Sequence, residues 1–217
     1  NGYKDEEFAD LALYGRKLGL QTVLVLDMPE ELPLAIERAQ RAGVRPMLGV
    51  RAKLSTRGSG HWTDSAGDRG MFGLTISQII EVVDRLRAAG MLDCLRMLHF
   101  HIGSQIPNIR IIQHACREAS RIYAGLVAEG APMGFLNVGG GLAVDYDGSH
   151  TSFACSSNYT LQEYADDIVE WIGRAMDESG VDHPTIVSES GRAVVAHHSV
   201  LLFNVLGVTR FEASPPP

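Results

Sequence analysis

Three short segments of the sequence carry side chains or backbone groups that could do chemistry, and each follows an apolar, β-rich run. The first is His99-Phe100-His101. Alternate residues of a strand share one face, so both histidines are expected to point the same way, toward the interior of the sheet. They could be ordinary core residues, they could share a divalent metal ion, or one ring could pack against a flat cofactor. The motif alone does not show which of these three roles the histidines have.

The second segment is the glycine run Gly139-Gly140-Gly141, which follows the apolar residues 135–138. Successive N–H groups without Cβ obstruction can cradle an anion, and phosphate is the usual guest. The alternative is a tight turn, although three glycines exceed what a turn needs. The run is not a P-loop, because no Gly-Lys-Ser/Thr follows it, and it is not a dinucleotide-binding fingerprint, because its glycines have a different spacing.

The third segment contains Glu189 and Arg192, which lie three residues apart at the end of another apolar run. They could pair with each other. They could instead grip opposite poles of a ligand, with Glu189 on a protonated ring nitrogen and Arg192 on a phosphate. A stacking ring, a phosphate cradle and a buried carboxylate together fit pyridoxal phosphate better than a metal ion.

Alternating β-rich and amphipathic segments must position these groups. This alternation predicts an α/β fold with a parallel sheet. Two capping boxes, Thr75 to Gln78 and Thr160 to Glu163, mark helix starts. The predicted strands are residues 21–27, 46–53, 95–102, 135–138 and 185–189, with a last strand at 200–208, and the other predicted helices are residues 5–18, 31–42 and 108–129.

Two architectures fit this order of elements: an open doubly wound sheet, or part of a (β/α)₈ TIM barrel. The polar and glycine-rich signals follow the carboxyl ends of the strands repeatedly, and in a barrel these ends converge on one mouth. We therefore expect a partial barrel with about five of its eight strands, and a chain that is a piece of a longer protein. Two long polar loops, residues 55–70 and 145–159, are expected to border this mouth or a subunit contact.

The composition narrows the class of protein. The chain has 217 residues, of which 45% are apolar, and a net charge of −7 from 26 acidic and 19 basic residues. These values predict a globular protein that does not bind nucleic acid. No apolar run is long enough to cross a membrane, and no signal peptide is visible. Three cysteines without metal-like spacing indicate reduced thiols and a cytoplasmic location.

Several ordered motifs resemble those of the alanine-racemase-type pyridoxal-phosphate-dependent decarboxylases. They are HFHIGSQ at 99–105, NVGGGL at 137–142 and ESGR at 189–192. Further stretches are similar to the branch that acts on L-arginine: NGYKD at 1–5, LGVRA at 48–52, MLDC at 91–94, and residues 191–198. The resemblance covers nearly the whole chain. It implies a TIM barrel over residues 1–198 and the truncated start of a C-terminal β domain at 199–217.

The resemblance also implies a role for each matching residue. His101 would stack on the pyridine ring, and Glu189 would pair with the pyridinium nitrogen; these two carry the catalytic roles. The phosphate would be held by Ser104 and the amides of Gly139, Gly140 and Gly141, with Arg192 near it, and Arg51 would lie close to the cofactor. The family implies L-arginine as substrate, agmatine and CO₂ as products, and a place in polyamine synthesis. It further implies Mg²⁺ dependence and a homo-oligomer with shared active sites.

Some family features are missing from the sequence. The Schiff-base lysine would precede Asn1, and none of Lys4, Lys17 and Lys53 matches its position. The catalytic cysteine would lie in the β domain, so the chain alone is expected to be inactive.

Alternatives to this reading are a decarboxylase of ornithine or diaminopimelate, a non-catalytic relative, and a metal-dependent TIM-barrel hydrolase. The hydrolase would use His99 and His101 with Asp145 or His198 as metal ligands.

Overall fold

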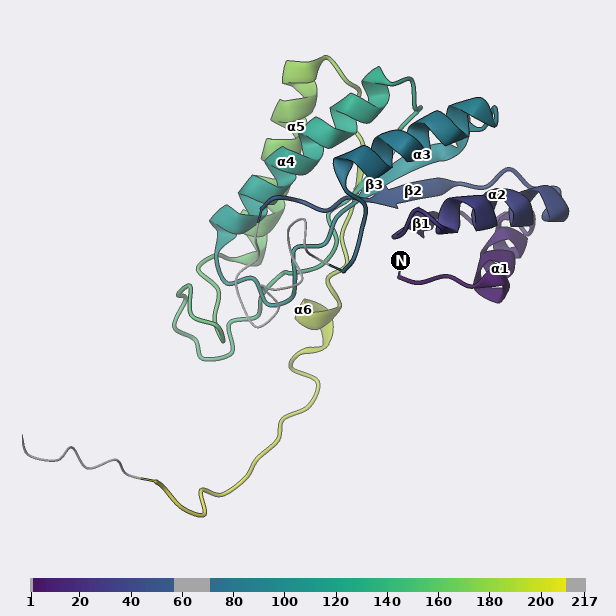
Figure 1. The fold of residues 1–217 in the computed structure, drawn as a ribbon. Coiled ribbons are helices and arrows are strands. Elements are labelled where there is room, and N and C mark those ends of the chain that lie inside the picture. The colour runs from purple at the N-terminus through teal and green to yellow at the C-terminus, as the bar shows by residue number, and fades with distance from the viewer. Residues whose placement is uncertain (1, 57–70, 210–217) are drawn as a thin grey trace, which may run out of the picture.

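The computed structural model describes residues 2–56 and 71–209, and the predicted loop at 55–70 therefore lies mostly outside the described residues. Five parallel strands form one sheet (Figure 1). They are β1 (Leu24–Leu26), β2 (Leu48–Arg51), β3 (Leu95–His99), β4 (Phe135–Asn137) and β5 (Thr185–Val187). All five predicted strands are confirmed, although each is shorter than its apolar run.

The strand order decides between the two predicted architectures. The strands lie in the sheet in chain order, β1-β2-β3-β4-β5. A doubly wound sheet reverses direction at a switch point, whereas a barrel adds each strand beside the previous one. The sheet is therefore a partial (β/α)₈ barrel, as predicted.

The longer helices lie along the outside of the sheet, whereas the short last helix lies apart from them (Figure 1). The helices are α1 (Glu6–Lys17), α2 (Glu31–Ala42), α3 (Ile76–Ala88), α4 (Ile109–Ala128), α5 (Leu161–Ser179) and the short α6 (Gly191–Val195), with a 3₁₀ turn η2 (Leu92–Cys94) before β3. Both capping boxes are formed, at the starts of α3 and α5. Because capping and apolar periodicity are local, the helix bounds agree closely with the prediction. None of the helices described within residues 2–56 and 71–209 is both long and apolar enough to cross a membrane.

The alternation along β3 sorts side chains between the two faces of the sheet. Leu98 and Phe100 are buried in the main hydrophobic core with the inner faces of the helices. His99 lies on the opposite face and is 1% exposed. The predicted division of this strand into a core face and a histidine face is therefore formed.

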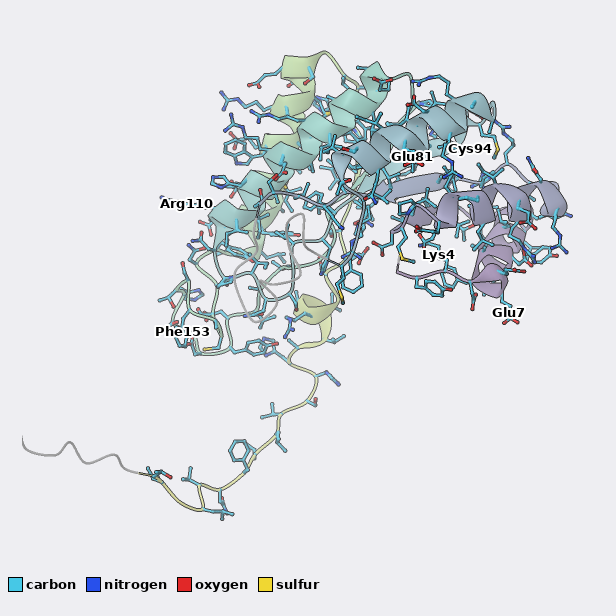
Figure 2. The ribbon with its side chains drawn as sticks, viewed as in Figure 1. Lys4, Glu7, Glu81, Cys94, Arg110 and Phe153 are labelled. Carbon is cyan, nitrogen blue, oxygen red and sulfur yellow. The ribbon has the colours of Figure 1, made fainter. Side chains whose placement is uncertain are left out.

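The N-terminal segment is tied to α2 by a buried ion pair. The Nζ of Lys4 lies 2.9 Å from the Oε2 of Glu31, and both side chains are 3% exposed (Figure 2). Glu31 also accepts the N–H groups of Lys4 and Asp27, so its buried charge is well satisfied. Lys4 is thus committed to a structural contact.

The prediction of a strand at residues 200–208 is wrong for this chain. Residues 199–209 form neither helix nor strand, and this segment runs away from the rest of the molecule (Figure 2). Its apolar side chains are exposed to solvent, and Leu206 is 98% exposed. A strand needs a neighbour for its backbone hydrogen bonds, and no described segment pairs with this run. The domain boundary near residue 199 stays a prediction, and residues 210–217 lie outside the described residues.

Candidate functional site

The predicted site residues gather at the carboxyl ends of the strands. Arg51, His99 and Asn137 lie side by side across β2, β3 and β4, in direct register. Asp27 follows β1, and Glu189 follows β5. In a barrel this end carries the active site, because the loops after all strands meet there.

The glycine run is packed tightly against the ends of β3 and β5. A Cβ added to Gly139 would lie 2.3 Å from the carbonyl oxygen of Phe100. One on Gly140 would lie 3.0 Å from the carbonyl oxygen of Glu189, and one on Gly141 would lie 3.0 Å from the side chain of Ile106. The glycines are therefore needed to bring three segments of the site together, and Gly139 (φ +67°) and Gly141 (φ +116°) also adopt left-handed backbone.

The amides of the glycine run do not act as one uniform cradle. The N–H of Gly139 donates to the Oδ1 of Asn137 at 2.8 Å, and the N–H of Gly140 donates to the Nδ1 of His101 at 3.2 Å. Among the described residues, only the N–H of Gly141 in this run donates to no protein acceptor. The run therefore offers one N–H to an anion and uses the other two to orient side chains.

A second polar group at this end of the sheet consists of a guanidinium and two hydroxyl groups. The guanidinium of Arg192 donates to the Oγ of Ser104 at 2.9 Å and to the hydroxyl of Tyr146 at 3.1 Å. Arg192 is on α6, Ser104 follows β3, and Tyr146 is in the loop after β4. A guanidinium flanked by two hydroxyl groups has the chemistry that suits a phosphate.

Glu189 is held by Asn137, whose Nδ2 donates to its Oε1 at 3.1 Å. The carboxylate is exposed, whereas the sequence analysis expected it to be buried. The reason is that Glu189 follows β5, which is an edge strand and has a neighbouring strand on one side only among the described residues.

The two histidines differ in their surroundings. Burial lowers the pKa of His99 to about 4, and its Nδ1 lies in the interior. Loss of solvation lowers the pKa of His101, and the positive charge of Arg51 lowers it further. Since His101 accepts a hydrogen bond at Nδ1, its neutral ring carries the proton on Nε2. A neutral ring suits stacking on a cofactor.

Arg51 is anchored beside the histidines. Its Nη1 lies 3.1 Å from the Oδ2 of Asp27, and its guanidinium carbon lies 5.1 Å from the ring centre of Phe72. The sequence analysis singled out neither Asp27, Asn137 nor Tyr146. Of these three residues, only Asn137 could have been predicted from the sequence, because it is part of the NVGGGL stretch.

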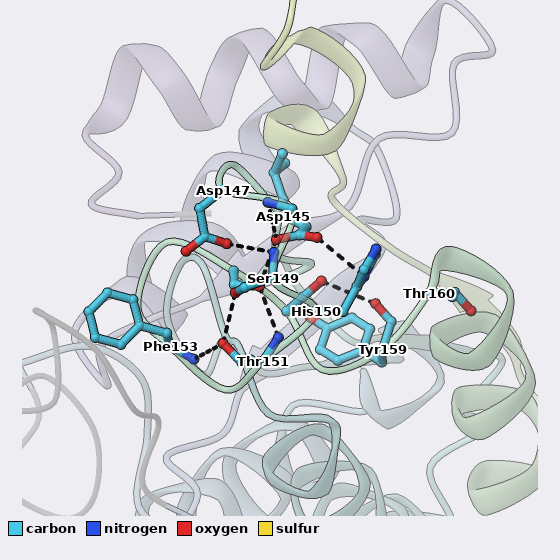
Figure 3. A network of polar contacts seen from close by, with 12 residues as sticks. Asp145, Asp147, Ser149, His150, Thr151, Phe153, Tyr159 and Thr160 are labelled. Carbon is cyan, nitrogen blue, oxygen red and sulfur yellow. Dashed lines mark hydrogen bonds and ion pairs between the residues drawn. The ribbon is translucent and has the colours of Figure 1, made fainter.

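The loop at 145–159 is braced by its own polar contacts (Figure 3). Asp145 accepts hydrogen bonds from Gly148 and Ser156 and lies 3.2 Å from the Nδ1 of His150. The backbone N–H of Ser149 is the main cause of a lowered pKa at Asp147. The loop therefore holds Tyr146 in a defined place without regular secondary structure.

Two pairs of hydrogen bonds connect this loop and the residues just before it to the segment after β3. The side-chain amide of Gln105 donates to the carbonyl of Val144 at 2.7 Å and accepts from its N–H at 3.0 Å. The hydroxyl of Tyr159 donates to the carbonyl of Ile106 and accepts from the N–H of Ala143. Ser104 and Tyr146 are thereby held on the same side of Arg192.

The alternative metal site is not formed. In the part of the chain that the structure describes, no group of three or more His, Cys, Asp or Glu side chains could hold a metal ion. His99 and His101 are instead separated into a buried and an exposed residue, and Asp145 is engaged in its own loop.

Comparison with known proteins agrees with this geometry. Residues 1–196 match the family model of the pyridoxal-dependent decarboxylases, specifically their pyridoxal binding domain. The chain belongs to this family. The contacts of Arg192 with Ser104 and Tyr146, and the side chains of His101 and Glu189, therefore lie within the residues that match this domain.

Individual relatives are also similar over nearly the whole chain. The biosynthetic arginine decarboxylase of Thermosynechococcus vestitus is 53% identical over 216 residues, which is 100% of this chain and 34% of the relative. That of Rhodopirellula baltica is 54% identical over 209 residues, 96% of this chain and 31% of the relative. The crystal structure of the enzyme from Campylobacter jejuni has a TM-score of 0.78 at 33% identity, covering 89% of this chain and 31% of that one. The chain thus spans about a third of the length of the curated relatives it matches.

Proposed function

We propose that this chain is the cofactor-binding part of an arginine decarboxylase that converts L-arginine to agmatine and CO₂. The observation that carries the proposal is the grouping of His101 and Glu189 with the contact between Arg192 and Ser104 at one end of the sheet. The identity of just over 50% to two biosynthetic arginine decarboxylases supports arginine as the substrate.

Each group of the site has a task in this reaction. Pyridoxal phosphate, when bound, supplies a ring that accepts the electron pair left behind as CO₂ departs. Arg192, Ser104 and the N–H of Gly141 would bind its phosphate, and His101 would pack on the ring. Glu189 would accept a hydrogen bond from the ring nitrogen and keep a proton there. Arg51, anchored by Asp27, would add positive charge close to the cofactor.

The overall reaction requires one bond to break and one to form. The bond between Cα and the carboxylate of L-arginine breaks, CO₂ leaves, and a proton takes its place at Cα. The lysine that links the cofactor in the family has no counterpart here. Lys4 is held by Glu31, Lys17 is on α1, and Lys53 follows β2. We therefore propose that the 217-residue chain alone is inactive.

The experiment that tests the substrate uses the full-length protein containing this sequence, loaded with pyridoxal phosphate. Purified enzyme is offered L-arginine, L-ornithine and meso-diaminopimelate separately, and the amine products are quantified by mass spectrometry. Agmatine from arginine, with far less product from the other two, is the expected result. A preference for ornithine or diaminopimelate would contradict the substrate assignment, and bound cofactor without any amine product would indicate a non-catalytic relative. Agmatine formed by the 217-residue chain alone would show that the missing lysine is not needed.

Further properties that the family resemblance implies are also proposals. We propose that the enzyme acts in polyamine synthesis in the cytoplasm, where the three free cysteines would stay reduced. We propose a homo-oligomer with shared active sites. We also propose that the Mg²⁺ dependence belongs to the whole enzyme.

A further inference from the structure

Asn137 is a buried polar residue at the centre of the site. It ends β4, between β3 and β5, and is 6% exposed. Its carbonyl accepts the N–H of Phe100, so its backbone is locked in the sheet. Its side-chain amide hydrogen-bonds two parts of the site, the carboxylate of Glu189 and the N–H of Gly139. A hydrogen bond of the same side chain also acts on His99, where it raises the pKa against the effect of burial.

The two bonds need a donor and an acceptor in one short planar group. Asparagine supplies both, whereas an ionised aspartate only accepts and an aliphatic side chain does neither. The bond from the N–H of Gly139 back to the Oδ1 of Asn137 is an Asx-type turn, which sets the direction of the glycine run. The next N–H along, that of Gly140, then meets the Nδ1 of His101.

One side chain therefore links two groups that come from different strands. Glu189 is hydrogen-bonded to Asn137 directly. His101 is linked to Asn137 through the turn that Asn137 starts, because the N–H of Gly140 in this turn donates to His101.

We propose that Asn137 is a positioning residue, whose amide fixes the Glu189 carboxylate relative to the imidazole ring of His101. In this arrangement Glu189 would contact the ring nitrogen of pyridoxal phosphate, and His101 would pack on the face of the cofactor ring. The inference rests on the proposed function, since it assigns both groups to that cofactor. It adds a residue that contacts neither the cofactor nor the substrate.

Asn137→Asp gives the sharpest test, because it replaces the donor and keeps an acceptor in a side chain of nearly the same shape, although it also places a titratable group beside His99. The new side chain still accepts from Gly139, but when ionised it repels Glu189 instead of donating to it. When protonated, its O–H restores a donor. Charged or titratable groups near this pair include Arg51, His99 and His101. The guanidinium of Arg51 carries a permanent positive charge, and burial lowers the pKa of both histidines, which favours their neutral forms.

The measurement is the Kd for pyridoxal phosphate of the full-length protein, followed by fluorescence between pH 5.5 and 8.5, as the ratio of variant to wild type at each pH. We expect a ratio near one at the acid end that rises to about three- to tenfold at pH 8.5, the size of one lost hydrogen bond at an exposed acceptor. The ¹⁵N shift of ring-labelled cofactor should show the ring nitrogen losing its proton at lower pH in the variant.

The matched control is Asn158→Asp. Asn158 also accepts a backbone N–H, that of Ile109 at 3.0 Å, but it lies before α5 and contacts neither Glu189 nor the glycine run. Its ratio should stay near one at every pH.

A second variant, Asn137→Leu, removes both bonds and should weaken binding at all pH values. If it fails to fold, the pH profile of Asn137→Asp still decides. A flat ratio for Asn137→Asp would overturn the inference while leaving the proposed function intact. Wild-type protein that binds no cofactor would overturn both.

Discussion

Replacing Gly139 with alanine should force the glycine run away from the end of β3. The added Cβ would lie 2.3 Å from the carbonyl oxygen of Phe100, a backbone atom that cannot rotate away. The residue also has φ +67°, which costs an L-residue about 1–2 kcal/mol. The backbone entropy that alanine removes from the unfolded chain returns about 0.4–1 kcal/mol. The backbone must also shift to remove the steric overlap, which costs about 1–3 kcal/mol more, the typical cost of overpacking a core. The total loss in free energy of unfolding is about 3 kcal/mol.

Gly148 provides a control with the same backbone strain and no overlap. Its φ is +72°, and no atom lies within 4 Å of an added Cβ. Gly148→Ala should therefore cost only about 1 kcal/mol.

The assay is urea unfolding followed by circular dichroism, with the affinity for pyridoxal phosphate as a second measurement. Gly139→Ala should lose about 2 kcal/mol more than Gly148→Ala, and only the former should bind the cofactor more weakly. Equal losses in both variants would refute the close approach of the glycine run to β3.

Three further perturbations test other parts of the structure. Glu31→Gln leaves the buried ammonium of Lys4 without its counter-charge, which should cost about 3 kcal/mol and lower the Tm by about 6–12 °C; an unchanged Tm would contradict the buried pair. His99 is neutral in the folded chain with a pKa of about 4 but titrates near its ordinary value when unfolded. The unfolded state thus binds more protons between these two values, and stability should fall by up to about 3 kcal/mol as the pH drops from 6.5 to 4. In His99→Gln the free energy of unfolding, measured by urea titration at each pH, should depend less on pH than in the wild type. The same pH dependence in both proteins would contradict a buried, neutral His99. Tyr146→Phe removes one hydrogen-bond partner of Arg192 and should weaken pyridoxal phosphate binding about threefold, measured by fluorescence titration; unaltered affinity would show that Arg192 is placed without it.

Features that depend on neighbours along the chain could be predicted from the sequence. The starts of α3 and α5 follow from Thr75 and Thr160, because a capping box closes within four residues. The division of β3 into a histidine face and a core face follows from the period of two. The order of strands and helices predicted the barrel, and the ends of the strands predicted where the site lies.

Features that depend on pairing across the chain could not be predicted. The apolar run at 200–208 has the composition of a strand, yet it forms none, because strand formation requires a partner that composition does not reveal. The short helix α6 has five residues, too few for an amphipathic period to be recognised. The exposure of Glu189 likewise follows from the position of β5 at the sheet edge.

The partners inside the site were decided by the tertiary structure alone. The sequence indicated that His101, Gly139 and Glu189 share one end of the sheet, because parallel strands bring their carboxyl ends together. It did not indicate that two glycine N–H groups are used to orient Asn137 and His101. Hydrogen bonds between residues 39 or 52 positions apart, such as those of His101 and Glu189, depend on ångström-scale placement. That placement results from the packing of the whole sheet against its helices, which no local pattern of residues encodes.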